Sequence, residues 1–268
     1  MVMLGKADAY FTIGMPLEKQ YLPKIQETRP GLQVTSMLDG IDQLPMAAHH
    51  HPKDEEAHDA DEGHDHDADE THDGEEGHDH QAEAPHENGH DGHNHGAHDP
   101  EEHVHVGELD PHVWLSPALL KVLAWNIAKA LTEADPAGAD YYEANVDAFE
   151  ADLDALDIRL KEKLDPHRGK AFYVFHPAFG YFAEAYHLQQ HAVESNGQSL
   201  TPKQLLQLAT VMKAEAAKVI FAQPQFDAKG AKVLGQQIGA TVESIDPLEE
   251  DVIANLEKIA NTIEAALR

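Results

Sequence analysis

Three polar side chains of this sequence stand where they could hold a metal ion. His176 and Asp246 each directly follow a segment with the pattern of a buried strand, and His112 lies just before "LSP", which is typical of a helix start. If the segments that carry them face one another, two imidazoles and one carboxylate form a borderline-soft ligand set. Such a set suits Zn²⁺, and Mn²⁺ is the alternative for harder ligands.

Each of these residues also has a plainer interpretation. A histidine after a strand is often structural, His112 can simply orient the turn before the helix, and Asp246 precedes a proline as many turn and cap residues do. We assign no role to His167, His187 or His191. Spacing alone therefore indicates a metal site without excluding purely structural roles.

A second candidate for metal binding is the polar segment from His49 to His105, which carries 20 Asp and Glu residues against one Lys. The motif "GHDH" occurs twice and "GHNH" once, a low-complexity pattern, and we expect no fixed structure in the metal-free segment. Many imidazoles on a flexible chain predict weak, multiple binding that is lost in mild acid. A solvated linker or a purification tag is the alternative. The candidate accessory ligands are His64, His66, His78, His80, His93, His95, His103 and His105.

Composition excludes several classes of partner and site. The formal net charge of −30 repels phosphate backbones and anionic lipids, so we expect cations as partners and no nucleic acid. With no Cys, disulfides and thiolate metal sites are impossible. The sequence as given contains no run of about 18 apolar residues and no signal peptide pattern.

The elements that must position these side chains predict an α/β fold. A strand, a helix and a strand are expected before residue 40, and a long helix of roughly 28 residues, about 42 Å, is expected to end at Leu164. Strands and helices then alternate, which is typical of βαβ units with a parallel sheet. In such sheets ligands bind beyond the carboxyl ends of the strands.

We therefore expect two lobes, each with a mostly parallel sheet flanked by helices, joined by the long helix. The predicted division is a first metal-binding lobe over 1–135 with an insert at about 46–108, the linking helix over 136–165, and a second metal-binding lobe over 166–268.

The motifs "DPHVWLSP", "YYEANVDAF", "FHPAFGYFAEAY", "LTPKQL", "KVIFAQPQF" and "IDPL" follow one another in this order. In this combination the chain resembles the zinc- and manganese-type substrate-binding proteins of ABC transporters, the ZnuA-like and TroA-like family. The resemblance implies a periplasmic or extracytoplasmic monomer, not an enzyme, that holds one metal ion between two lobes joined by a rigid helix and passes it to a membrane permease. It also implies His112, His176 and Asp246 as ligands. Members with Glu in place of the second-lobe His look manganese-type, so His176 favours zinc.

The sequence departs from the family pattern at two places. Relatives usually have an upstream "PH" motif with a first His ligand, so we expect an incomplete first lobe, and His103 or His105 could fill the missing position. Gln223 stands where relatives often have an acidic residue, and we do not expect it to bind metal.

Three functions remain in competition. The leading one is a high-affinity Zn²⁺-binding component of a zinc ABC uptake transporter, with the insert as an accessory zinc collector; a manganese-type protein is its variant. A metallohydrolase would use the same ligands plus water, but no predicted helix carries an "HExxH" motif and no general base can be identified beside the ligands. A cytoplasmic zinc buffer would rely mainly on the insert.

Overall fold

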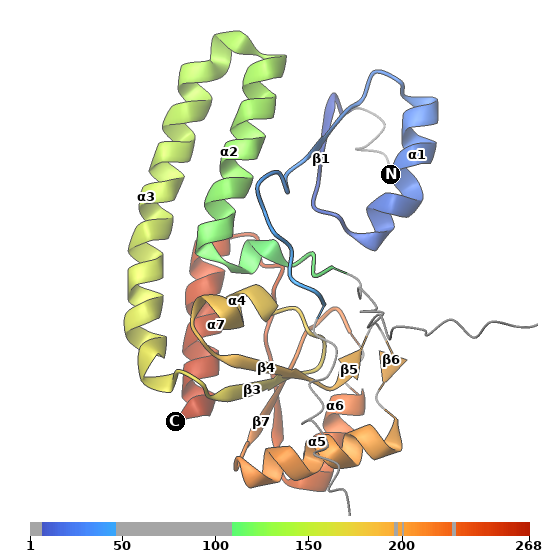
Figure 1. The fold of residues 1–268 in the computed structure, drawn as a ribbon, viewed down its shortest axis with the longest axis vertical. Helices are drawn as coiled ribbons and strands as arrows, with labels where there is room; N and C mark the ends of the chain where they lie inside the picture. Colours follow the sequence, from blue (N-terminus) through green and yellow to red (C-terminus); the bar gives the residue numbers. More distant parts are fainter. Residues whose placement is uncertain (1–6, 47–108, 196–197, 200, 227–228) are drawn as a thin grey trace, which may run out of the picture. The chain divides into compact units, whose positions relative to one another are not determined.

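The computed structural model describes residues 7–46, 109–195, 198–199, 201–226 and 229–268 (Figure 1). All of these residues belong to one compact unit of the chain. The candidate accessory ligands of the insert, His64 to His105, lie outside the described residues. No helix in the described part is long and apolar enough to cross a membrane.

The chain begins with a parallel strand pair linked by a helix, as the sequence predicts. β1 (Ala9–Thr12) pairs with β2 (Gln33–Ser36) in the register Ala9↔Gln33, and α1 (Pro16–Thr28) connects them. Gly14 adopts φ +80°, which glycine tolerates at no steric cost, and this lets the chain turn from strand to helix. The Glu18 carboxylate accepts the Met15 N–H at 2.9 Å and so satisfies a free donor at the start of α1.

Two long helices follow and pack along each other, as Figure 1 shows. The short 3₁₀ turn η2 (Val113–Leu115) leads into α2 (Pro117–Ala134), and α3 (Ala139–Leu164) follows after the 3₁₀ turn η3 (Pro136–Gly138). With 26 residues α3 is about 39 Å long, close to the predicted length. Ser116 of the "LSP" motif occupies the N-cap position of α2, but its side chain makes no cap bond and only its carbonyl accepts the Leu120 N–H.

The second half of the chain forms a four-stranded parallel sheet in the order β4-β3-β7-β8. Its strands are β3 (Ala171–Val174), β4 (Gln189–Ala192), β7 (Val219–Ala222) and β8 (Thr241–Ser244). The helices between and after them are α4 (Gly180–Ala185), α5 (Pro202–Ala214), α6 (Lys229–Ile238) and α7 (Val252–Leu267), with the 3₁₀ turn η4 (Asp165–His167) before β3 and a small antiparallel pair, β5 (Glu194–Ser195) and β6 (Gln198–Ser199).

Alternating residues of β3 and Phe175, which directly follows it, contribute to two hydrophobic clusters, one on each face of this sheet. Phe172 and Val174 join the cluster that contains the buried leucines of α3 and the apolar face of α7. Tyr173 and Phe175 join the cluster formed with α5 and α6. This period of two is what a strand buried on both faces requires. The fold is therefore mixed α/β with parallel sheets flanked by helices, which confirms the predicted class.

Candidate metal centre

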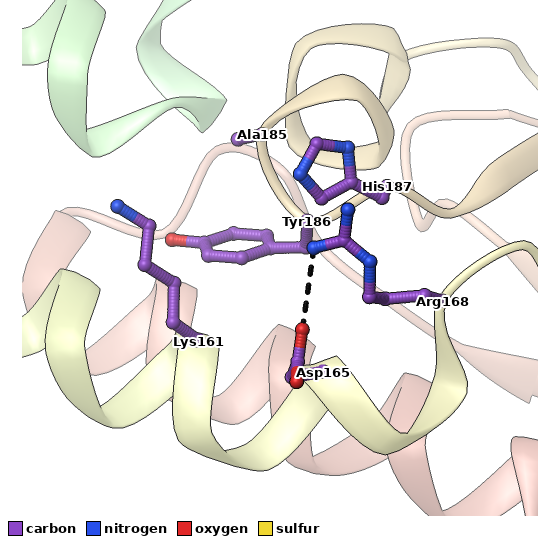
Figure 2. Close-up of a pocket in the computed structure, with 6 residues that line it drawn as sticks. All are labelled: Lys161, Asp165, Arg168, Ala185, Tyr186 and His187. Carbon is purple, nitrogen blue, oxygen red and sulfur yellow. Dashed lines mark hydrogen bonds and ion pairs between the residues drawn. The ribbon is translucent and has the colours of Figure 1, made fainter.

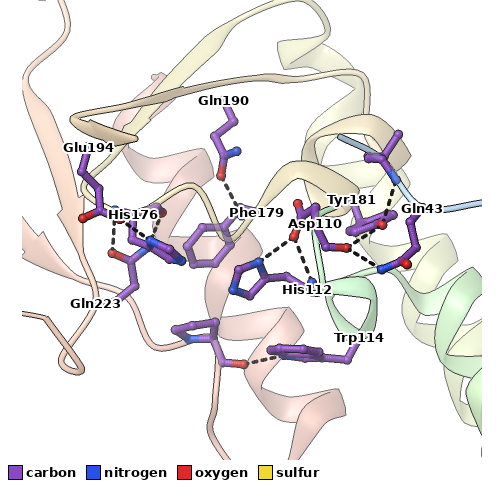
Figure 3. A network of polar contacts seen from close by, with 12 residues as sticks. Gln43, Asp110, His112, Trp114, His176, Phe179, Tyr181, Gln190, Glu194 and Gln223 are labelled. Carbon is purple, nitrogen blue, oxygen red and sulfur yellow. Dashed lines mark hydrogen bonds and ion pairs between the residues drawn. The ribbon is translucent and has the colours of Figure 1, made fainter. Parts of the chain in front are cut away.

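The structure brings two of the three predicted ligands together. The ring centroids of His112 and His176 lie 5.4 Å apart, with the ring planes at 73° to each other (Figure 3). His112 is the residue before η2, and His176 comes two residues after the end of β3. Their meeting places an imidazole from the segment before α2 beside the carboxyl end of the parallel sheet, where α/β folds bind ligands.

A buried carboxylate sets the orientation of His112. Asp110 Oδ1 lies 2.6 Å from His112 Nδ1 and also accepts the backbone N–H of His112 at 2.9 Å. An ionised carboxylate only accepts hydrogen bonds, so the proton of the neutral imidazole belongs on Nδ1. Nε2 is then the nitrogen with a free lone pair, which is the arrangement found in metal-binding histidines.

His176 is oriented in the same way from a different element. Its Nδ1 is hydrogen-bonded to Glu194 Oε1, and Glu194 is only 4% exposed. The face of the His176 ring stacks on Phe226, with centroids 4.4 Å apart, which restricts rotation of the ring. In both imidazoles a buried carboxylate binds Nδ1, which leaves Nε2 as the nitrogen with a free lone pair.

Gln223 holds the backbone of His176. Its Nε2 donates to the His176 carbonyl at 2.7 Å, and its Oε1 accepts the His176 N–H at 3.1 Å. Both ends of the buried amide are thus engaged by one peptide segment. This arrangement gives Gln223 a positioning role for the His176 backbone, and the expectation that it does not bind metal stays a prediction.

Asp246, the third predicted ligand, is tied into a turn. Its Oδ1 accepts from Gln225 Nε2 at 2.7 Å and from the Leu248 N–H at 2.9 Å, and its carbonyl accepts from Asn255 Nδ2 at 2.8 Å. Within the described ranges, no three His, Asp or Glu side chains gather into a group that could hold a metal ion. The role of Asp246 as a ligand stays a prediction.

One bond connects the turn of Asp246 to the segment of His112. Trp114 Nε1 donates to the carbonyl of Pro247 at 2.9 Å, and the Trp114 ring lies 5.3 Å from the His112 ring. Trp114 thus links the residue next to Asp246 with a residue two positions after His112. The indole is also a natural optical probe of this site.

Asp110 is held in turn by a buried tyrosine, Tyr181 of α4. Burial raises the pKa of the Tyr181 hydroxyl, partly offset by the Leu44 N–H that it accepts, and the charges of Asp110 and Glu184 raise it further. The hydroxyl therefore keeps its proton and can donate to the Asp110 carbonyl, 2.9 Å away.

The histidines to which the sequence assigns no role are found in structural settings. His167 Nε2 lies 3.6 Å from Glu264 Oε1, and His191 stacks on Tyr173. His187 is exposed and adopts φ +55° two residues after the end of α4.

Sequence reasoning missed the two carboxylates that orient the imidazoles. Asp110 precedes His112 by two residues, a spacing that could have been noticed. Glu194 is 18 residues after His176, and only the pairing of β3 with β4 makes them neighbours.

Two hollows in the described part of the chain involve other residues. One, of about 140 Å³, is lined by side chains at the ends of α3 and α4, where Arg168 pairs with Asp165 at 3.2 Å (Figure 2). Basic groups at a helix C-terminus are explained by the helix dipole. A larger hollow of about 480 Å³ lies between the starts of β3 and β7 and the end of α7. Neither is lined by His112 or His176.

Comparisons with known proteins also indicate a metal-binding protein. Residues 1–266 match the ZnuA family model, described as zinc-uptake complex component A, periplasmic. The high-affinity zinc uptake system protein ZnuA of Yersinia pestis is 30% identical over 261 residues, which cover 96% of this chain and 73% of that protein. ZnuA of Brucella abortus is 34% identical over 144 residues, 53% of this chain and 43% of that protein.

Among solved structures, a crystal structure of ZnuA has a TM-score of 0.74 and 30% identity, over 99% of this chain and 82% of that chain. The alignments span about half the length of the first curated relatives that the chain matches.

Proposed function

The chain belongs to the ZnuA family of zinc-uptake components, and on that premise we propose that it is a substrate-binding component that captures Zn²⁺ and passes it to the membrane permease of an ABC transporter. Zinc is then the cargo, and the protein carries out no chemical turnover. The proposal includes a periplasmic or extracytoplasmic location and a monomeric protein.

The observation that carries this proposal is the pair of carboxylate-oriented imidazoles. Zn²⁺ binds imidazole nitrogen at about 2.0–2.1 Å, and conserved partners on the other ring nitrogen are the usual means of fixing such ligands. His112 with Asp110 and His176 with Glu194 provide this arrangement twice, with the rings 5.4 Å apart. Two nitrogen ligands favour Zn²⁺ over Mn²⁺, which prefers oxygen donors.

We propose Asp246 as the third ligand. Its segment is connected to that of His112 through the bond between Trp114 and Pro247. Metal binding would require the Asp246 carboxylate to turn from its present partners, Gln225 and the Leu248 N–H, or to use its other oxygen. His103 or His105 is proposed for a fourth position, and the remaining histidines of the insert for low-affinity collection of zinc.

The proposed architecture is that of two metal-binding lobes, 1–135 and 166–268, joined by the helix within 136–165. A rigid connecting helix limits hinge motion, so loading with zinc should cause small local changes rather than wide closure. Release of the ion would then depend on contact with the permease.

The test is a zinc titration of the full chain, with Trp114 emission as the readout in a Trp125→Phe background. We expect one tight site, weakened at least about 100-fold by His112→Ala or His176→Ala, since each removes a ligand. His187→Asn is the matched control, because it removes an imidazole elsewhere and Asn tolerates the positive φ of that position.

A second variant separates the site from the insert. Deletion of residues 48–101 should leave the tight site intact and remove only weak, multiple binding. If deletion abolishes all zinc binding, or if the two alanine variants bind zinc as tightly as the parent chain, the proposed function is wrong.

A further inference from the structure

A hydrogen-bonded bridge connects α4 to the residue that orients His112. The Tyr181 hydroxyl donates to the Asp110 carbonyl at 2.9 Å and accepts the Leu44 N–H at 2.9 Å (Figure 3). Gln43 Nε2 donates to the same carbonyl at 3.2 Å. Tyr181 and Asp110 are each only 2% exposed, so water can replace these bonds only poorly. The bridge therefore constrains the backbone of Asp110.

The first residue of α4 constrains the other end of Asp110. A Cβ atom placed on Gly180 would lie 2.8 Å from Asp110 Oδ2, closer than real contacts allow. The absence of a side chain at this position is what lets the carboxylate approach α4. Gly180 and Tyr181 together therefore define where both the carbonyl and the carboxylate of Asp110 can lie.

Through this contact, the segment that includes α4 influences both proposed ligands. His176 lies only four residues before the start of α4, so a single short segment carries one imidazole and supports the carboxylate of the other. A displacement of α4 would change the position of His176 and the orientation of His112 together.

We propose that Tyr181 is a positioning residue for metal binding: by holding Asp110, it keeps His112 in the Nδ1–H tautomer and so presents Nε2 to the metal. Gly180 acts in the same way by leaving space for the carboxylate. The expected effect of Tyr181 on zinc binding rests on the proposed function. The effect of Tyr181 on the tautomer of the His112 ring does not require metal.

Tyr181→Phe removes the hydroxyl and keeps the ring. Tyr186→Phe is the matched control, since Tyr186 lies at the end of the same helix, is 3% exposed and donates to Asp157 Oδ1 at 3.1 Å, away from the imidazole pair. For the full chain, the unfolding free energy is measured without metal and the zinc Kd by competition with a chelator. The His112 tautomer is read from the ¹⁵N shifts of the metal-free, neutral ring.

We expect Tyr181→Phe to raise the zinc Kd about 3- to 10-fold, less than the 10- to 100-fold typical of a direct partner of a ligand. The His112 ring should become a mixture of tautomers. Tyr186→Phe should leave the Kd within about twofold and the tautomer unchanged, even if both variants lose similar stability. In an Asp110→Ala background, Tyr181→Phe should cause no further loss of affinity, because its effect passes through Asp110.

The proposal is overturned if Tyr181→Phe leaves the tautomer of the His112 ring as in the parent chain. It is also overturned if Tyr181→Phe raises the zinc Kd by the same factor in the Asp110→Ala background. Should the parent chain bind no zinc, the proposed function fails while the ¹⁵N measurement still decides the role of Tyr181. If Tyr181→Phe does not fold, Gly180→Ala tests the part of the proposal that concerns α4 and the carboxylate, since its methyl group displaces that carboxylate directly. An unchanged His112 tautomer in this variant overturns the proposal.

Discussion

The orientation of His176 by Glu194 leads to a prediction whose size can be worked out from the structure. Glu194 is buried, and its Oε1 accepts from the His176 ring. Replacement by Gln keeps the shape and an acceptor oxygen but removes the charge. Hydrogen bonds that involve a charged group contribute about 1.5–3 kcal/mol, and neutral ones about 0.5–1.5 kcal/mol. The expected loss is therefore about 1–1.5 kcal/mol.

Only the part of this loss that differs between the metal-bound and free states weakens binding. Metal on Nε2 makes Nδ1–H a stronger donor, so most of the charged contribution belongs to the bound state. A loss of about 1.4 kcal/mol raises the zinc Kd about tenfold. Glu194→Ala also removes the acceptor, so nothing fixes the tautomer of His176. We therefore expect the zinc Kd to rise by up to about 100-fold.

Competition with a chelator, followed by Trp114 emission, measures both variants. Glu215→Gln is the control, because that carboxylate accepts from the Tyr173 hydroxyl at 2.6 Å and contacts neither imidazole. It should leave the Kd unchanged within about twofold. The reasoning is refuted if both Glu194 variants bind zinc as the parent does, or if Glu215→Gln weakens binding equally.

The remaining predictions concern stability and the link beside Asp246. Trp114→Phe loses the bond to the Pro247 carbonyl and should cost about 0.5–1.5 kcal/mol in urea unfolding, together with weaker zinc binding if that turn carries a ligand. Leu156→Ala, at a fully buried position of α3, should lower the unfolding free energy by about 2–5 kcal/mol and show no effect on the zinc Kd of the folded chain. Burial raises the pKa values of Tyr173 and Tyr186, which means that the folded state holds these protons more tightly. Their contribution to stability should be intact below the ordinary tyrosine pKa of about 10 and decline as the pH rises above it; ultraviolet titration of tyrosinate beside urea unfolding measures this. A flat stability profile above pH ~10 would contradict it.

Most of the fold could be predicted from local patterns along the chain. The spacing of Leu153, Leu156 and Leu160 predicts one buried stripe of a long helix, and all three are fully buried in α3. Alternating strands and helices predict the parallel sheet because few other arrangements cover both faces of buried strands. The side chain of Ser116 shows the limit of such patterns, since a cap residue type does not ensure a cap bond.

The sequence by itself determined the element types and which residues stand at strand ends and helix starts, because periodicity and turn chemistry are local properties. It thereby identified His112 and His176 as candidate metal ligands, and the family motifs support this assignment. Only the tertiary structure decided that the two rings meet, that Asp110 and Glu194 select the same nitrogen of each ring, and that Tyr181 holds Asp110 from 71 residues away. Hydrogen bonds of this kind depend on separations of a few tenths of an ångström between segments distant in the chain, and packing of the whole unit sets such separations.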